Sequence, residues 1–416
     1  MTEMTVRPMK NLPGTSIVPS EWEPRFCGVG ELVSGRRPES DFMSDLIEVA
    51  QLAIEDAAIS FDDIDTLLLI PCLHSPQDQA DLIFSRVAEE LGLLNRLKTN
   101  LLLHSGGSTS DNAARVAAGL IGSGQARNVL IVQAERWGSG SVESATDMLS
   151  GYGIPKEWEQ PAGLSFNAIG ALITARYMHD SGSTPEEMAA ICVALRDWAN
   201  LNPRAMYRDK KLTVDKVLSS KVVADPLHAF ECPMLADGAV AMVMRAAGEL
   251  DADGPASVRI AGSGGEVSHY SVGQEADLSV LGWVGAARQA FEQAGWTPED
   301  LDLAEIYDSY AAVVAIAAEG IGISKKGEAA RDFASGRFSP GGSLPVNTNG
   351  GLLSAGHTGV GGGFALLAEA VRQLQRRAEG DRQVADCRRA VVGGTGGSYM
   401  DAQVLLLERV PGGEAA

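Results

Sequence analysis

The chain has 416 residues, of which 45% are hydrophobic and 21% charged, as is typical of a globular protein large enough for two domains or one duplicated unit. Its net charge of −20, from 34 basic and 54 acidic residues, argues against nonspecific binding to nucleic acid or to an anionic membrane. The same charge is unfavourable for an anionic substrate unless the site is locally basic or a partner supplies cations.

The N-terminal residues show no charged segment followed by an apolar one, and no uncharged apolar run approaches about 18 residues. We therefore expect neither a signal peptide nor a transmembrane helix, and cytoplasmic location is the default expectation. The five cysteines are scattered without CxxC spacing, so we expect no disulfide framework and no metal site.

An internal similarity predicts a duplicated α/β unit. Residues 44–72 and residues 279–310 each indicate an amphipathic helix, an acidic turn and an apolar strand. Residues 113–121 and 361–376 each indicate a helix of small residues that leads to a further strand. Similarity at this long period predicts two fused copies of one unit, and the alternation of strands with helices predicts α/β layers with mainly parallel, buried strands.

We place the two halves at residues 20–250 and 255–412. The first half contains a stretch of different composition, residues 140–220, which we interpret as an inserted loop domain that covers the site. Within it, a Ser-Thr pair followed by Pro and two acidic residues predicts the start of a long helix over Pro185–Asn200.

A glycine-rich turn at residues 104–112 follows an apolar strand and precedes a helix that we expect to begin near Ala113. A strand–turn–helix junction presents one side chain and several backbone N–H groups at a single point, and enzymes often place a nucleophilic Cys or Ser there. The central positions are Gly106 and Gly107. The turn therefore has the setting for an acyl-transfer nucleophile but lacks the nucleophile.

Tyr307 and Asp308 follow an apolar strand that ends at Ile306. Ligand groups cluster at the carboxyl ends of strands in α/β folds, so both are candidate site residues. The alternative is structural, with Tyr307 packed in the core and Asp308 acting as a helix N-cap.

His357 lies in a second glycine-rich segment, directly after Gly356 and two residues before Gly359. Glycines this near let other groups approach the ring, and His is the side chain best suited to move a proton near neutral pH. We therefore interpret His357 as functional. Asn347 and Asn349 are better suited to stabilising the turn, although Asn349 is retained as a candidate substrate contact.

A third glycine-rich segment, residues 391–397, suits a loop at a strand end against which a ligand lies. Gly394 is its candidate substrate contact. The segment contains neither GxGxxG nor GK[ST], so a nicotinamide or ATP site has little support.

Cys232 has the most suggestive context among the thiols, because it precedes Asp237-Gly238, which we interpret as a turn before a strand. The favoured interpretation is nonetheless a small buried residue. Cys72, at the end of a strand near His74, is interpreted in the same way. The remaining histidines have no comparable context: His104, His179, His228 and His269.

These segments, in this order, resemble the thiolase superfamily, specifically the sterol-carrier-protein-type thiolases and their lipid-transfer-protein-like relatives. The resemblance extends over about residues 25–410 and is densest in residues 175–241, which look like the family's insertion domain and return strand. The text before Gly356-His357 looks like the family's Gly-His-Pro loop, and residues 307–310 occupy the place of its Asn-Glu or His-Asp-Cys-Phe motif. The resemblance implies an α/β thiolase fold, a duplicated five-layer αβαβα arrangement with an inserted loop domain, and a homodimer.

The departures from the family pattern indicate a different reaction. The family's nucleophilic Cys falls at or within one residue of Gly107, its acid/base Cys falls at Val391, and the Pro after the His is Thr358. A covalent thiolase mechanism is therefore disfavoured. Ser108 or Ser105 would replace the nucleophile only with an adjacent base.

The resemblance implies retro-aldol cleavage of a β-hydroxyacyl-CoA as the first hypothesis. Tyr307, His357 and Asp308 are then the catalytic candidates, with Tyr307 moving a proton if the site lowers its pKa. His357 and the backbone N–H groups at the start of the helix over residues 108–121 form the oxyanion hole. The candidate substrate contacts are Gly107, Ser108, Asn349 and Gly394.

Coenzyme A enters as part of the substrate, and we expect no separate cofactor. The resemblance implies a small partner that carries an OB fold and a zinc ribbon. An acyltransferase or condensing subunit and a noncatalytic acyl-CoA-binding scaffold remain the alternatives.

Overall fold

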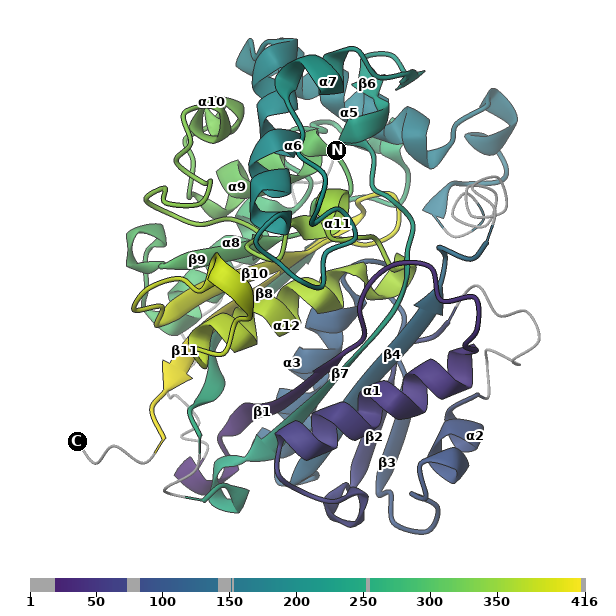
Figure 1. Ribbon diagram of the computed structural model, residues 1–416, viewed down its shortest axis with the longest axis vertical. Coiled ribbons are helices and arrows are strands. Elements are labelled where there is room, and N and C mark those ends of the chain that lie inside the picture. Colours follow the sequence, from purple (N-terminus) through teal and green to yellow (C-terminus); the bar gives the residue numbers. More distant parts are fainter. Residues whose placement is uncertain (1–18, 73–82, 141–150, 152, 252–254, 413–416) are drawn as a thin grey trace, which may run out of the picture.

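The structure, a computed structural model, describes residues 19–72, 83–140, 151, 153–251 and 255–412. Its main strands form one nine-stranded mixed sheet in the order β3-β2-β4-β7-β1-β8-β11-β10-β9 (Figure 1). In chain order the strands are β1 (Pro24–Glu31), β2 (Thr66–Leu69), β3 (Thr99–Leu102), β4 (Asn128–Arg136), β7 (Asp237–Ala246), β8 (Ser257–Val267), β9 (Leu303–Ile306), β10 (Arg389–Gly394) and β11 (Asp401–Val410).

The sheet confirms the predicted duplication. The order β2-β4-β7-β1 in the first half is mirrored by β9-β10-β11-β8 in the second, and the inner strands β1 and β8 pair antiparallel where the halves meet. Strand β2 pairs parallel with β3, and Ala304 of β9 forms a parallel bridge to Val346 in the matching place. Each half therefore repeats one topology.

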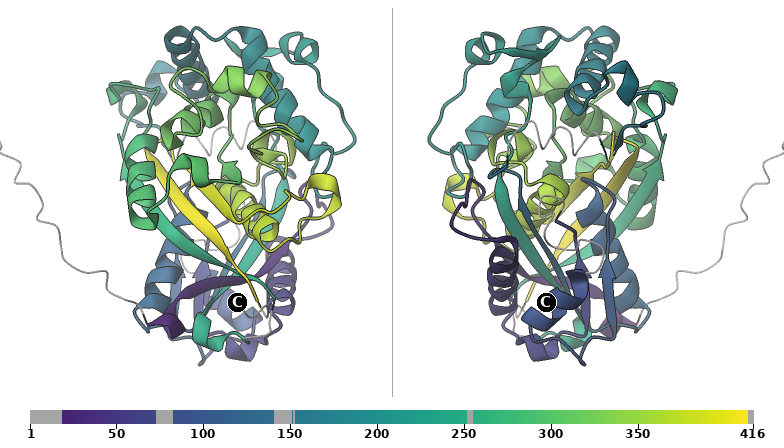
Figure 2. Two further views of the ribbon diagram at one scale, coloured as in Figure 1. Left: turned by 90° about the vertical axis from the view of Figure 1, so that its left-hand side faces the viewer. Right: turned by 90° about the vertical axis from the view of Figure 1, so that its right-hand side faces the viewer.

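Helices α3 (Thr109–Gly122) and α12 (Gly362–Leu374) pack against each other and share a hydrophobic core with strands of both halves. Figures 1 and 2 show them between the two parts of the sheet. Helices α1 (Phe42–Asp56) and α2 (Ile83–Glu90) cover the outer face of the first half, and α8 (Trp283–Ala294) and α9 (Ala311–Ile321) cover that of the second. These are the five layers that the resemblance implies.

Glycines at matching positions let α1 and α8 approach the two inner strands closely. A Cβ on Gly30 of β1 would lie 2.2 Å from the carbonyl oxygen of Val49, and one on Gly264 of β8 would lie 2.0 Å from that of Ala286. Only glycine allows backbone contact this close, so the packing of the outer helices is also duplicated.

The chain between β4 and β7 contains α5 (Phe166–Ser181), α6 (Pro185–Ala199), α7 (Val214–Leu218) and a small ribbon of β5 (Val222–Ala224) and β6 (Leu227–His228). The predicted long helix is α6. Thr184 and Glu187 form a capping box at its start, with each side chain bonded to the other residue's backbone N–H. Two short helices, α10 (Ala329–Ala334) and α11 (Gly351–Ser354), follow α9 in the second half.

The expectation of mainly parallel strands is wrong, because five of the eight strand pairs described in this sheet are antiparallel. Two local predictions are also wrong. Helix α3 begins at Thr109, one turn before Ala113, with Ser108 at the N-cap position. Asp237 and Gly238 lie inside β7 and are not a turn. The buried Asp237 carboxylate accepts backbone N–H bonds from two neighbouring loops, which satisfy it within a strand. In the described part of the chain, no helix combines the length and apolar character needed to cross a membrane.

Candidate active site

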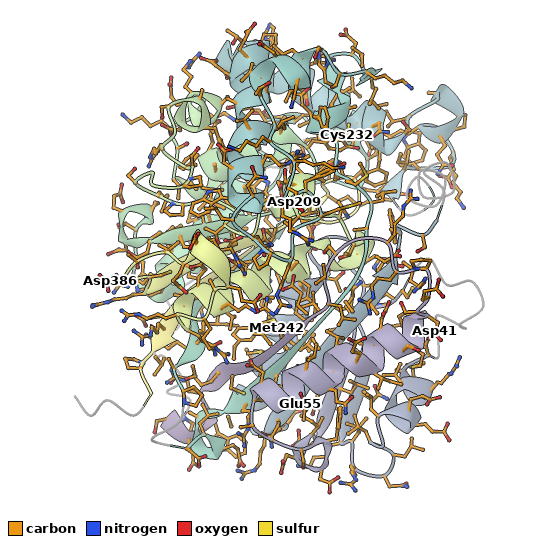
Figure 3. All side chains as sticks on the ribbon, in the orientation of Figure 1. Asp41, Glu55, Asp209, Cys232, Met242 and Asp386 are labelled. Carbon is orange, nitrogen blue, oxygen red and sulfur yellow. The ribbon has the colours of Figure 1, made fainter. Side chains whose placement is uncertain are left out.

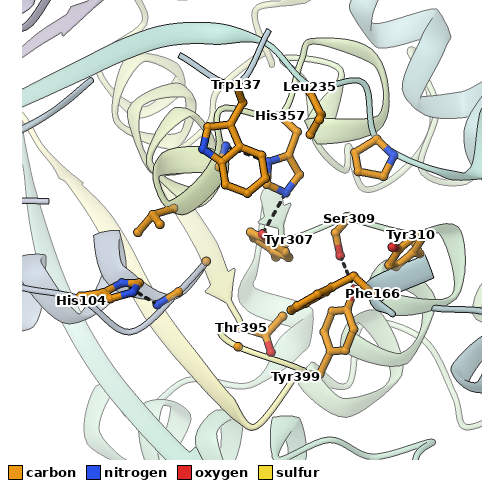
Figure 4. A pocket seen from close by; sticks show the side chains of 16 residues that line it. His104, Trp137, Phe166, Leu235, Tyr307, Ser309, Tyr310, His357, Thr395 and Tyr399 are labelled. Carbon is orange, nitrogen blue, oxygen red and sulfur yellow. Dashed lines mark hydrogen bonds between the residues drawn. The ribbon is translucent and has the colours of Figure 1, made fainter. Parts of the chain in front are cut away.

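A cavity of about 90 Å³ lies where the segments after β3, β4, β9 and β10 meet the region between β4 and β7 (Figure 4). Residues that follow the carboxyl ends of four strands therefore share the lining of one cavity. The lining residues are His104, Gly106, Gly107, Trp137, Phe166, Pro233, Leu235, Tyr307, Ser309, Tyr310, His357, Gly359, Val360, Thr395, Gly397 and Tyr399.

Tyr307 and His357 meet in this cavity, as predicted from their separate motifs. The hydroxyl oxygen of Tyr307 lies 3.1 Å from Nε2 of His357, and both side chains are buried. The backbone N–H of Tyr307 donates to the carbonyl of Gly393 at 2.8 Å, and that of His357 donates to Met234 at 2.8 Å. The sheet and the segment before β7 thus fix the two residues independently.

The hydrogen bonds of His357 define which nitrogen carries its proton. The backbone N–H of Gly359 donates to Nδ1 at 3.0 Å, so in the neutral ring the proton resides on Nε2. Burial lowers the pKa of His357 to about 4, which keeps the ring neutral at physiological pH. His357 therefore presents an N–H donor to Tyr307 and to the cavity, and the Trp137 ring stacks against it.

The condition set for Tyr307, that the site lowers its pKa, is not met. Burial and the nearby charge of Asp308 raise the pKa of this phenol well above its usual range. Tyr307 is therefore a neutral hydroxyl at rest, and it cannot serve as a preformed phenolate base.

Gly107 faces the phenol directly. A Cβ on this residue would lie 2.5 Å from both Cζ and the hydroxyl oxygen of Tyr307, and 2.6 Å from the carbonyl oxygen of Thr395. Real Cβ atoms essentially never approach other atoms this closely. No side chain fits at position 107 while Tyr307 occupies its present place.

Asp308 caps a helix other than the one that follows it in sequence. Its carboxylate accepts the backbone N–H groups of Leu352 at 2.8 Å and Leu353 at 3.1 Å, in α11, whereas Tyr310 occupies the N-cap of α9. Burial raises the pKa of Asp308 to about 7. Asp308 is not among the lining residues, so its contacts support a positioning role for the segment that leads into His357.

Three predicted substrate contacts lie behind the cavity surface. Ser108 donates to the carboxylate of Asp401 at 2.8 Å, and Gly394 lies in β10 against the buried Asp111. Asn349 accepts the backbone N–H of Gly351 at 2.7 Å. None of the three lines the described cavity, and their contact with substrate stays a prediction.

Asn347 has the turn-stabilising role that we expected. Its amide bonds both the N–H of Ile306, at 2.6 Å, and the carbonyl of Ile306, at 2.7 Å. The side chain thereby ties the His357 segment to the end of β9.

No cysteine lines the described cavity. Burial raises the pKa of Cys232 to about 12, and its thiol donates weakly to the carbonyl of His228 (Figure 3 marks its place). The thiol of Cys72 donates to Glu135 at 3.1 Å, whereas His74 lies outside the described residues. Both contexts are those of structural thiols.

The sequence interpretation missed much of the cavity wall. His104 lines it, although its sequence context suggested nothing. No local sequence signal marks the aromatic residues Phe166, Trp137 and Tyr399, because only the tertiary fold brings them together. Tyr310 was within reach of prediction, because it closes the segment that begins with Tyr307. Among the described residues, no group of three or more His, Cys, Asp or Glu side chains is placed to hold a metal ion.

Comparisons with known proteins identify the family. Residues 264–409 match the family described as Thiolase C-terminal domain-like. A 17-hydroxy-3-oxo-4-pregnene-20-carboxyl-CoA lyase from Mycobacterium tuberculosis is 32% identical over 78% of this chain and 84% of its own length. An acetyl-CoA acetyltransferase from Methanothermobacter thermautotrophicus is 29% identical over 89% of this chain and 96% of its own length. Among solved structures, the Ltp2-ChsH2(DUF35) aldolase matches with a TM-score of 0.79 and 25% identity, over 93% of this chain and 98% of that chain.

The chain therefore belongs to the thiolase superfamily. Relatives named sterol carrier protein 2, together with the lyase and the aldolase above, place it in the branch of the sterol-carrier-protein-type thiolases. The family and fold inferred from the sequence are both confirmed.

Proposed function

We propose that this chain is an enzyme that cleaves the Cα–Cβ bond of a β-hydroxyacyl-CoA by a retro-aldol reaction, without an acyl-enzyme intermediate. The observation that carries the proposal is the complementarity of Gly107 and Tyr307, because the phenol fills the space that a nucleophilic side chain would need. The similarity to a lyase and to an aldolase of the same family supports this reaction class.

The two neutral donors suit an enolate mechanism. As the Cα–Cβ bond breaks, the Tyr307 oxygen accepts the hydroxyl proton of the substrate and in the same step releases its own proton to the α-carbon, so the phenol never carries two protons. The bonding pair gives the thioester of the shorter acyl-CoA its enolate character during this step. The Nε2–H of His357 donates to the enolate oxygen. The backbone N–H of Thr109 already donates to the carbonyl of Gly106 and no residue of α3 is among the described lining residues, so the expected contribution of the α3 N–H groups has no support in the described site. Tyrosine is neutral before and after the cycle, in agreement with its raised pKa.

An acyltransferase is the second candidate, since the acetyl-CoA acetyltransferase relative covers nearly the whole chain. It would require a nucleophile or a direct transfer. Ser108 is buried and bonded to Asp401, and the five thiols are absent from the described cavity wall. A noncatalytic scaffold is disfavoured because it needs no hydrogen bond between Tyr307 and His357.

We also propose a cytoplasmic homodimer that works with a small partner carrying an OB fold and a zinc ribbon, and with CoA as part of the substrate only. The two-protein name of the aldolase structure supports a partner. The chain has a net charge of −20 and CoA is also an anion, so a cationic surface on the partner would help to bind the substrate.

The test incubates the protein and its partner with β-hydroxyacyl-CoA thioesters and measures the released ketone or aldehyde and the shorter acyl-CoA. Tyr307→Phe is expected to lower kcat about 10²–10⁴-fold, and His357→Gln about 10²–10³-fold. The exposed Tyr270→Phe and His179→Ala are matched controls and should leave kcat unchanged. Acyl transfer in the absence of any carbon–carbon cleavage, or full activity in both cavity variants, would defeat the proposal.

A further inference from the structure

The inner wall of the cavity is built from aromatic rings held by hydrogen bonds. The Tyr310 hydroxyl donates to Oδ1 of Asn167 on α5 at 2.9 Å, and the Tyr399 hydroxyl is bonded to Oγ of Ser309 at 2.8 Å. The two rings meet edge to face with centroids 6.4 Å apart. Figure 4 shows Phe166 beside them, at the same end of the cavity.

These rings have little freedom to move aside. Tyr310 is 4% exposed and Tyr399 is 3% exposed. A Cβ on Gly170 of α5 would lie 2.7 Å from the Tyr310 ring, so this ring packs directly on the helix backbone. A buried ring with a bonded hydroxyl resists displacement, because moving it leaves a polar group without a partner. The wall therefore limits what the cavity admits.

The same wall has no charge to offer a ligand. Among the described lining residues there is no Lys, Arg, Asp or Glu. The Thr395 hydroxyl donates to the carbonyl of Asp401 at 2.6 Å, and the other hydroxyls of the inner wall have the partners given above. The lining also includes the polar side chains of Tyr307, His357 and His104.

We propose that Tyr310, Tyr399 and Phe166 form a size filter, and that the group released as ketone or aldehyde is short, uncharged and apolar. The cavity of about 90 Å³ is smaller than the roughly 150 Å³ cavity that accommodates benzene. A charged group there would lose its hydration without gaining a counter-ion. This inference rests on the proposed retro-aldol function, and it separates this chain from the relative whose name specifies a pregnene-carboxyl-CoA.

The experiment measures binding and cleavage separately, with the full chain and its partner. Binding uses non-cleavable CoA thioethers whose acyl end is methyl, ethyl, phenyl, decalinyl or carboxymethyl, and cleavage uses the matching β-hydroxyacyl-CoA series. We expect affinity and kcat/KM to fall at least about tenfold from ethyl to phenyl, to decalinyl and to carboxymethyl. Tyr399→Ala should raise the ratio of kcat/KM for the phenyl substrate to kcat/KM for the methyl substrate by about tenfold or more, and the ratio of affinities likewise. Tyr399→Phe keeps the ring and should leave that ratio within about twofold.

If Tyr399→Ala fails to fold, Phe166→Ala provides a second variant that enlarges the cavity, at a less buried position. Equal affinity of the wild type for decalinyl and methyl thioethers would overturn the filter, as would unchanged ratios in both alanine variants. The expected binding order with no cleavage of any substrate would support the filter and overturn the proposed reaction.

Discussion

Replacement of Gly107 by alanine tests how closely Tyr307 fills the glycine turn. The new Cβ would lie 2.5 Å from the phenol oxygen and 2.6 Å from the carbonyl oxygen of Thr395, so the ring or the turn must move. Overpacking of this kind costs about 1–3 kcal/mol of folding free energy. Displacement of the hydroxyl also removes its proton transfer, which contributes about 10²–10⁴-fold to the rate. We expect a lower Tm and a loss of kcat in that range.

Thermal unfolding and steady-state cleavage assays measure both effects. Gly119→Ala is the control, because it lies in the helix that follows this turn and its Cβ would meet nothing within 4 Å. That change should stabilise α3 by up to about 1 kcal/mol and leave kcat unaffected. Gly107→Cys should clash in the same way and form no acyl adduct. A Gly107→Ala protein with the Tm and kcat of the wild type would refute the reasoning, as would acyl transfer through a cysteine at this position.

The remaining predictions concern titration and buried charge. Because the pKa of His357 is lowered to about 4, kcat/KM should show no imidazole limb between about pH 5.5 and 8; a limb near pH 6.5 would contradict this. The pKa of Asp308 is raised to about 7, so its stabilising contribution is complete below about pH 4 and is lost as the pH rises through 7. Wild-type stability should therefore fall relative to Asp308→Asn over that range, and parallel pH profiles would count against it. Arg382→Ala removes the ion-pair partner of the buried Glu369 and should cost about 3–5 kcal/mol in chemical unfolding. Arg376→Ala at the surface should cost at most about 1 kcal/mol, and similar losses in the two variants would contradict the burial argument.

The duplicated layers were predictable because helix and strand periodicity repeats in both halves of the sequence. Tyr307 and His357 were predictable one at a time, since each stands in a distinctive segment at a strand end or among glycines. Their hydrogen bond joins residues 50 positions apart. Tertiary structure creates it, because β10 holds Tyr307 and the segment before β7 holds His357.

Other features depend on tertiary structure alone. The raised pKa of Tyr307 follows from complete burial, which residue type and spacing do not reveal. Asp308 was correctly considered as a helix cap, but the helix that it caps begins 43 residues later in the chain, so sequence neighbours pointed to the wrong helix. The inner wall combines Phe166, Tyr310 and Tyr399 from three distant segments, and of these only Tyr310 lies in a motif that the sequence singles out.

Rapid-quench single turnover with a β-hydroxyacyl-CoA tests the central claim most directly, when both products and the intact mass of the protein are followed in the same samples. We predict that carbonyl product and shorter acyl-CoA appear together, in equal amounts, while the mass of the protein stays unchanged at every time point. An acylated protein that forms and decays at the rate of turnover would contradict the account.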